Sequence, residues 1–211
     1  MPKLKKPRAT LPTQALPRPD RIIVGLALLG LAVAGYLPAL KLAGNPAFLC
    51  RDGSGCDIVQ ASRYSLLAGV PTALWGACLY AAVLVLSLVP QTARRWQTAF
   101  MLVSAAVAFS IYLTYVSIVV IGATCPYCLV SGGIALLLLV TMVVRRPGAP
   151  AGSARAYGLK RLATLGSTAG MAAVLLGAFI FAADISTPAG YQEALAKHLA
   201  RSKAVFYGAY W

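Results

Sequence analysis

The sequence CPYCLVSGGIALLLLVTMVV occupies residues 125–144 and contains no Asp, Glu, Lys, Arg or His. Its apolar residues cover every face of a helix rather than one stripe, which is typical of a helix surrounded by apolar groups. The hydrocarbon core of a bilayer is about 30 Å thick and needs about 20 such residues to cross it. A transmembrane helix is therefore predicted over residues 126–144.

Four further runs share this length and this lack of charge, and they cover residues 22–40, 70–89, 98–121 and 162–183. One such run is compatible with a buried helix of a soluble protein, but five are not. The first run also exceeds the apolar region of about 7–15 residues found in a signal peptide. With 59% hydrophobic and 11% charged residues in 211, the chain is predicted to be an all-α polytopic membrane protein.

The basic residues are distributed unevenly about these spans. Thirteen of the 19 Lys and Arg residues precede the first span or lie in the second–third and fourth–fifth connections, whereas four of the five acids lie in the alternate segments. By the positive-inside rule the amino terminus is cytoplasmic, and segments 41–69, 122–125 and 184–211 lie on the outer face. The net charge of +14 is thus an orientation signal, and a nucleic-acid partner is not expected.

The segments outside the spans have simpler compositions. Residues 1–20 are basic and rich in proline, and they are predicted to form a disordered cytoplasmic tail. Residues 146–161 are predicted to form a flexible cytoplasmic linker. Within outer loop 41–69, residues 57–67 fit either a plain loop or a short surface helix. In the helix Ile58, Ala61 and Leu66 or Leu67 face the membrane and Arg63 faces water.

Four of the five cysteines are predicted to lie at the outer face, in an oxidising compartment where disulfides persist. Cys125 and Cys128 have the C-x-x-C spacing at the start of a helix, where Pro126 fits the first turn and the helix dipole favours the Cys125 thiolate. Cys50 and Cys56 enclose a loop with two glycines. Two such pairs at one membrane surface indicate a thiol–disulfide relay, while Cys78, inside a span, is expected to be a small buried hydrophobe.

The four outer cysteines have two other interpretations. A Cys₄ zinc site is disfavoured, because the five-residue gap between Cys50 and Cys56 is wider than the usual zinc spacing. No metal is therefore predicted. Inert structural disulfides remain open, because spacing alone does not establish exchange.

The electron acceptor is inferred from the groups that are missing from the sequence. No Gly-rich dinucleotide motif follows a strand, and the single histidine, His198, lies outside every span. A bis-histidine haem within the helices is therefore excluded. A quinone dissolved among the membrane lipids, of the menaquinone, ubiquinone, plastoquinone or phylloquinone type, fits an apolar site beside a C-x-x-C.

These residues resemble the bacterial homologues of vitamin K epoxide reductase. The resemblance covers roughly residues 20–145 and rests on the Cys50/Cys56 pair, on Ser62 six residues later, and on Cys125-Pro-Tyr-Cys128 at the start of the fourth helix. It implies a four-helix redox bundle over 21–145 around a quinone, with a fifth transmembrane helix at 162–183. It also implies a bacterial inner membrane with the redox cysteines on the periplasmic face.

The resemblance implies a role for each cysteine. A thioredoxin-like partner, fused or separate, attacks Cys50 of the Cys50–Cys56 disulfide, freed Cys56 attacks Cys125, and freed Cys128 passes electrons to the quinone. The protein thereby generates disulfides for secreted proteins. Residues 184–211 look like the start of a thioredoxin-like domain, since residues 204–211 are similar to the strand before its W-C-x-x-C motif.

Cofactor-binding candidates lie close to these cysteines in the chain. Ser62 is the hydrogen-bond donor or thiolate-stabilising group that the resemblance implies, and Cys128 faces the quinone. Ser131, one turn after the C-x-x-C, and Tyr115 on the third span are further candidates. The mammalian enzymes carry a tyrosine where this chain has Gly132, so their epoxide reduction and anticoagulant sensitivity are not expected to carry over.

Two competing functions remain at the level of sequence. A membrane disulfide-bond formation protein of the B type also pairs a C-x-x-C with a loop pair, but its C-x-x-C comes first along the chain. A non-catalytic membrane scaffold with structural disulfides is the alternative from another class.

Overall fold

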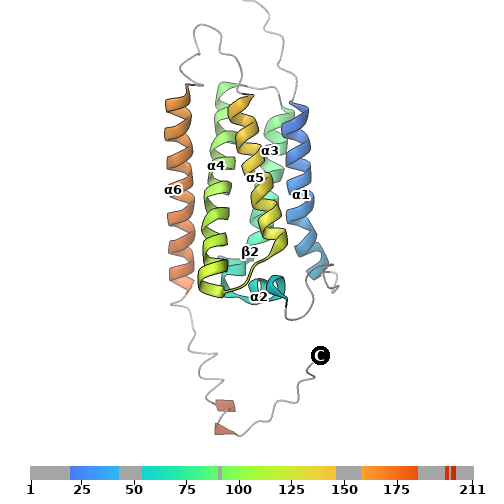
Figure 1. Cartoon of the computed structure of the whole chain (residues 1–211), viewed down its shortest axis with the longest axis vertical. Coiled ribbons are helices and arrows are strands. Elements are labelled where there is room, and N and C mark those ends of the chain that lie inside the picture. The colour runs from blue at the N-terminus through green and yellow to red at the C-terminus, as the bar shows by residue number, and fades with distance from the viewer. Residues whose placement is uncertain are drawn as a thin grey trace, which may run out of the picture.

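The computed structural model describes residues 20–42, 54–89, 92–145, 158–184, 198–199 and 201–202. The predictions for residues 1–20, 146–161 and 184–211 fall almost wholly outside these ranges, as does Cys50. Long helices dominate the described part (Figure 1), which confirms the all-α membrane fold class.

Five long helices run along one another in alternating directions. They are α1 (Arg21–Leu42), α3 (Thr72–Leu88), α4 (Ala93–Tyr115), α5 (Pro126–Val144) and α6 (Leu159–Asp184). A single π-helical segment, η2 (Val116–Ile121), continues α4 and ends at Gly122, whose positive φ of 72° suits glycine. Helices α1, α3, α4 and α5 form a four-helix bundle, and α6 packs along α4. In Figure 1, α6 and α1 lie at opposite sides of the molecule.

Within the described residues, four stretches are long and apolar enough to cross a membrane: Arg21–Leu40, Arg94–Ile121, Pro126–Val144 and Leu159–Ala183. The predicted span at 70–89 is shorter, because α3 has 17 residues, or about 25 Å at 1.5 Å per residue. Its first two residues instead form strand β2 (Val70–Pro71), which pairs antiparallel with β1 (Leu66–Leu67). The turn between the strands has positive φ at both Ala68 and Gly69, as a two-residue hairpin turn requires.

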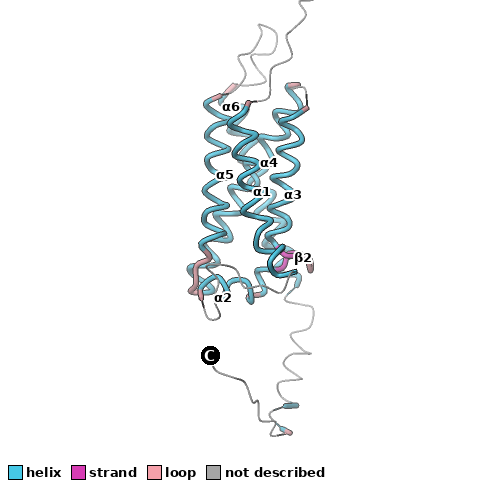
Figure 2. Tube along the Cα trace, turned by 90° about the vertical axis from the view of Figure 1, so that its right-hand side faces the viewer, coloured by secondary structure: helices cyan, strands magenta, loops and turns pink. Residues whose placement is uncertain are grey.

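The short elements gather at one end of the bundle, where α2 (Gly55–Ala61) and the 3₁₀ turn η1 (Arg63–Ser65) precede the hairpin. Figures 1 and 2 show α2 and β2 together at this end. The surface helix predicted from residue 57 thus begins two residues earlier, because the Ser54 hydroxyl accepts a hydrogen bond from the Asp57 N–H and caps it.

The buried face of this surface helix contains Cys56. Ile58 and Ala61, which are predicted to face the membrane, are exposed on the protein surface. Arg63 is exposed as expected and lies over the ring of Tyr64. The anchor of α2 is therefore the cysteine and the capping serine rather than an apolar stripe.

The bundle core contains close helix contacts. Ala27, Val83 and Leu138 are fully buried in it. Gly30 of α1 faces the ring of Tyr80 of α3 so closely that a Cβ at residue 30 would lie 2.3 Å from the ring carbon Cε1. The Tyr80 hydroxyl donates to the Ser131 carbonyl at 2.6 Å, which satisfies its polar end and links α3 to α5.

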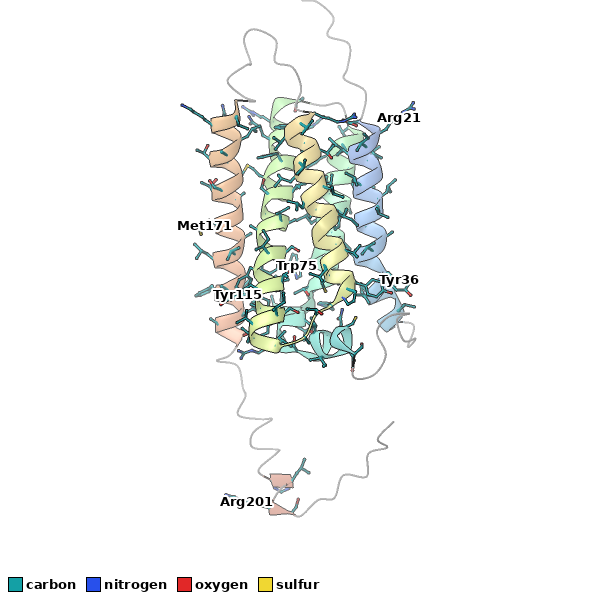
Figure 3. All side chains as sticks on the ribbon, viewed as in Figure 1. Arg21, Tyr36, Trp75, Tyr115, Met171 and Arg201 are labelled. Atoms are coloured by element: carbon teal, nitrogen blue, oxygen red, sulfur yellow. The ribbon has the colours of Figure 1, made fainter. Side chains whose placement is uncertain are left out.

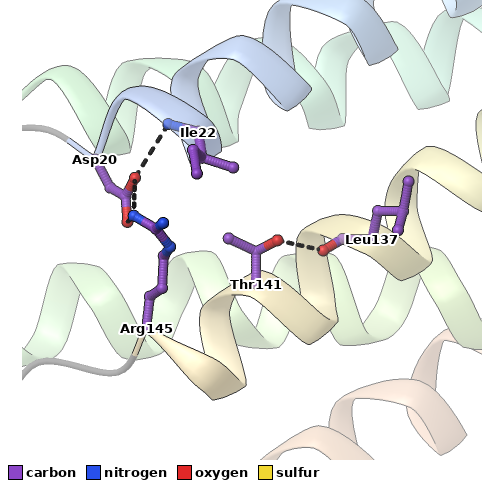
Figure 4. A network of polar contacts seen from close by, with 5 residues as sticks. All are labelled: Asp20, Ile22, Leu137, Thr141 and Arg145. Carbon is purple, nitrogen blue, oxygen red and sulfur yellow. Dashed lines mark hydrogen bonds and ion pairs between the residues drawn. The ribbon is translucent and has the colours of Figure 1, made fainter.

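The opposite end of the bundle carries polar contacts between α1 and α5 (Figure 4). Asp20 accepts a hydrogen bond from the Ile22 N–H at the start of α1. It also forms an ion pair with Arg145 at the end of α5, at 3.4 Å. Nearby, Thr141 donates to the Leu137 carbonyl within α5. The start of α1 and the end of α5 therefore lie at the same level, as the predicted topology requires.

Candidate active site: a row of sulfurs beside an apolar cavity

The C-x-x-C motif forms the first turn of α5. Cys125 is the N-cap residue and Pro126 begins the helix, so the Cys125 sulfur accepts a hydrogen bond from the Cys128 N–H at 3.4 Å. The Cys128 thiol donates to the same sulfur at 2.7 Å. The Tyr127 ring packs against Tyr36 of α1, with 5.5 Å between ring centroids, and this contact helps to fix the turn. The helix start predicted from Pro126 is confirmed.

Cys56 of α2 approaches this pair from the loop side. Its Sγ lies 3.9 Å from the Cys125 Sγ, and both sulfurs belong to buried residues. Cys56 is disulfide-bonded, whereas Cys125 and Cys128 are free thiols. Three sulfurs from two distant parts of the sequence therefore lie in a row.

Gly55 permits this approach of α2 to the C-x-x-C turn. A Cβ on residue 55 would lie 2.6 Å from the Thr124 carbonyl oxygen, which is closer than any ordinary contact. Because Thr124 precedes Cys125, the missing side chain of Gly55 lets one backbone rest on the other next to the two sulfurs. This positioning role was not predicted from the sequence, although the Gly-Ser-Gly run before Cys56 was visible there.

The electrostatics of the pair favour a thiolate on Cys125. The hydrogen bond from the Cys128 thiol lowers the pKa of Cys125 from 9.0 to about 7. Burial opposes this shift, while the backbone N–H groups of Cys128 and Tyr127 add to it. Charge-assisted hydrogen bonds of this kind stabilise an anion at a helix start, so the preference predicted for Cys125 agrees with the structure.

A cavity of about 690 Å³ adjoins the sulfurs and extends into the bundle. Its walls are mostly apolar and come from α1, α3, α4, α5, α6 and the loop elements; they include Trp75, Leu79, Phe109 and Leu113. Polar groups from Gln60, Thr114 and Ser131 also reach it. A cavity of this size and character is typical of a site for a small apolar ligand.

Two of the four predicted cofactor-binding residues line the cavity, and the other two do not. Cys128 and Ser131 line the cavity, and the Ser131 hydroxyl lies 3.3 Å from the Tyr80 hydroxyl. Ser62 is not among the described lining residues, and its hydroxyl donates to the Val59 carbonyl at 2.7 Å, within the end of α2. Tyr115 is 60% exposed and is likewise absent from the described lining.

Several lining residues were not anticipated. Gln60 and Tyr64 reach the cavity from the loop side, and Cys78 lines it from α3 and is exposed rather than buried as expected. Tyr80 also lines the cavity. A buried tyrosine in an apolar helix needs a hydrogen-bond partner, and this need is the sequence signal that could have pointed to it. At Gly132 a Cβ would lie 2.3 Å from the Ser110 hydroxyl oxygen, so a larger residue there requires Ser110 to move.

Comparison with known proteins agrees with this geometry. The chain is 28% identical over 198 residues to the thiol-disulfide oxidoreductase LTO1 of Arabidopsis thaliana, an alignment that covers 83% of this chain and 52% of the plant protein. The chain thus spans about half the length of that relative. Residues 21–143 match the family described as the Vitamin K epoxide reductase family. Because this match covers more than half of the chain and includes the whole row of sulfurs, the protein belongs to the vitamin K epoxide reductase family.

Proposed function

We propose that the protein is a membrane thiol–disulfide oxidoreductase that relays electrons from a thioredoxin-like partner through two cysteine pairs to a quinone, and so generates disulfides for secreted proteins. The observation that carries this proposal is the row of Cys56, Cys125 and Cys128, with sulfur separations of 3.9 and 2.7 Å, at a cavity of about 690 Å³. The family match and the printed activity of the plant relative support it.

The proposed relay begins at the loop pair. Cys56 is disulfide-bonded, and the three other described cysteines are free, so Cys50 is proposed as its partner. A thiolate of the thioredoxin-like partner attacks Cys50, the Cys50–Cys56 bond breaks, and Cys56 leaves as a thiolate. A second thiol of that partner then releases Cys50, and the partner becomes a disulfide.

The second exchange moves the electrons inward. The Cys56 thiolate attacks Cys125 of an oxidised Cys125–Cys128 pair, the Cys56–Cys125 bond forms and Cys128 leaves as a thiolate. The Cys50 thiolate then attacks Cys56, which re-forms the loop disulfide and releases Cys125. The lowered pKa of Cys125, about 7, makes it a good leaving group in this step.

The residues of the cavity fit a quinone as the acceptor. The walls are mostly apolar, Cys128 opens onto them, and Ser131 offers a hydroxyl one turn below Cys128. A quinone bound there would supply a two-electron, two-proton acceptor. Cys128 would pass on the electron pair as the Cys125–Cys128 disulfide re-forms, and the two protons would be those that the partner's thiols release when they are oxidised. Ser131 is the donor we propose for a ring oxygen.

The partner and the compartment follow from the same scheme. A thioredoxin-like domain, fused or separate, supplies the electrons, and the fact that the plant relative is about twice as long as the aligned region is compatible with fusion. The positive-inside distribution supports a cytoplasmic amino terminus. Together with the resemblance to bacterial members of the family, this orientation leads us to propose the inner membrane of a bacterium, with the row of sulfurs on the periplasmic face.

One experiment tests this function directly. Purified protein in nanodiscs is mixed with reduced thioredoxin and a soluble quinone, and quinol formation is followed by absorbance. Turnover is expected, and it should be lost when Cys50, Cys56, Cys125 or Cys128 is replaced by Ala. The Cys50→Ala variant should accumulate a Cys56–Cys125 disulfide, detected by peptide mass spectrometry, and Cys78→Ala should retain this cross-link in the same background. No thiol-dependent quinol formation would refute the proposal in favour of a scaffold.

A further inference from the structure

Helix α6 is held unusually close to α4 by three glycines. A Cβ at Gly166 would lie 3.1 Å from the Ser104 hydroxyl oxygen, one at Gly170 would lie 2.9 Å from the Ala108 Cβ, and one at Gly177 would lie 2.3 Å from the Phe109 ring. Small residues at such positions let two helix backbones approach within a membrane. The position of α6 against the bundle is therefore set by direct packing.

The outer end of α6 is also tied to the loop elements above the cavity. Phe181 is buried, and its ring meets Tyr64 of η1 edge-on, with 5.3 Å between centroids. The rings of Phe109 and Tyr112 of α4 also stack with Phe181, with 6.4 and 6.5 Å between centroids. Aromatic pairs at these distances are stabilising beyond their burial, so α6, α4 and the loop are fixed together around one ring.

This placement makes α6 part of the cavity wall. Ala173, Leu176, Gly177 and Ile180 of α6 line the cavity together with α3 and α4. Ala173 has a small side chain and leaves space that a larger residue would fill, whereas the space beside Gly177 is occupied by the Phe109 ring. The four-helix bundle alone therefore does not enclose the cavity.

Several residues of the cavity wall are exposed and therefore mark its rim. Ile118 and Leu129, which are 54% and 47% exposed, lie at the end of the bundle near the loop elements. Trp75 of α3 (Figure 3) and Leu176 of α6 are 50% and 61% exposed, and they mark an opening between these two helices. The main packing of α6 is with α4 and, at its end, with β1, and α3 and α6 make few direct contacts. Since the surfaces of both helices face lipid in a membrane, the opening leads into the bilayer.

We propose that the isoprenoid tail of the quinone leaves the bundle between α3 and α6, along the passage that the small side chain of Ala173 keeps open. The inference rests on the proposed function, in which a quinone is the acceptor. It assigns α6 a role in selecting tailed quinones. A tail of apolar isoprene units gains from remaining against the apolar groups of the passage and of the lipid.

The test compares Ala173→Phe with Ala172→Phe, which places the same bulk one residue earlier on an exposed part of α6 that lines neither described cavity. Binding of two naphthoquinones, one without a tail and one with an isoprenoid tail, is measured by equilibrium dialysis. Because the added ring would fill the passage, Ala173→Phe should weaken binding of the tailed quinone by about tenfold or more. Binding of the tail-free ring should change little, and Ala172→Phe should leave both unchanged.

A second measurement does not depend on a variant that folds. A quinone with a diazirine at the end of its tail is photolysed in the unmodified protein, and the labelled peptides are identified by mass spectrometry. Labels on α3 and α6 around Trp75 and Leu176 support the passage. Labels confined to α1 and α5, or equal loss of both naphthoquinones in Ala173→Phe, would overturn it. If neither naphthoquinone binds the unmodified protein, the proposed function fails rather than this route for the tail.

Discussion

Replacing Gly55 by Ala should separate the two cysteine pairs without removing any sulfur. The added Cβ would lie 2.6 Å from the Thr124 carbonyl oxygen, whereas ordinary contacts begin at 3.4 Å. The backbones must therefore move apart by about 0.8 Å if the clash is relieved by translation alone. Cys56 directly follows residue 55, so its sulfur, now 3.9 Å from the Cys125 sulfur, moves away with it. A misplacement of about 1 Å costs up to roughly 100-fold in rate.

We expect the exchange between Cys56 and Cys125 to slow by about tenfold to 100-fold in Gly55→Ala. The rate is measured in the Cys50→Ala background, where the Cys56–Cys125 disulfide has no resolving thiol. The inner pair is first oxidised, the reaction is quenched with an alkylating reagent at set times, and the cross-linked peptide is quantified. Gly133→Ala is the matched control, because a Cβ at residue 133 meets nothing within 4 Å.

A folding control separates slower exchange between Cys56 and Cys125 from a loss of folding. Thermal unfolding of Gly55→Ala in detergent should stay close to that of the parent, since the clash is confined to one backbone contact. If Gly55→Ala forms the cross-link at the parental rate, the argument that this contact positions the two sulfurs is refuted.

Two further predictions follow from the hydrogen bonds and the core. Replacing Cys128 by Ala removes the main hydrogen bond that lowers the pKa of Cys125, so that pKa should rise from about 7 towards 9.0. The thiolate absorbance of the reduced protein should then appear only at higher pH. The Cys128→Ser variant retains a hydrogen-bond donor and should keep much of the lowered pKa. Replacing Gly30 by Ala forces its Cβ into the Tyr80 ring, 2.3 Å away, and should destabilise the bundle by about 1–3 kcal/mol, whereas Gly25→Ala, with nothing within 4 Å, should not lower the midpoint of thermal unfolding.

The long helices were predictable because their signal is local and repeated. Each span is an uncharged run whose ends are marked by charge, proline or glycine, and the bilayer sets the length that such a run must have. The start of α5 at Pro126 needed only the preference of proline for a first turn. The shortened start of α3 was not predictable in this way, because it depends on the pairing of Val70–Pro71 with Leu66–Leu67, which no apolar run reveals.

The cavity lining could be predicted only in part, because side-chain direction depends on contacts within each element. Ser62 lies near Cys56 in sequence, but it ends α2, where its hydroxyl donates to the Val59 carbonyl. Ser131 lies one turn beyond Cys128 on a regular helix, so its position could be extrapolated. Tyr115 lies on α4, but the residue is 60% exposed. The helical period alone does not show which face of α4 meets the cavity.

The burial of Cys56 and Cys125 gives a reason for two cysteine pairs in the proposed relay. Cys125 is 2% exposed, so a partner protein cannot bring its own thiol to that sulfur without opening the bundle. Cys128 is exposed and lines the apolar cavity. In the proposed relay, electrons from a soluble donor pass through Cys56, which reaches Cys125 from the loop. This arrangement keeps the Cys125 sulfur buried while the other sulfur of the inner pair remains in contact with the cavity.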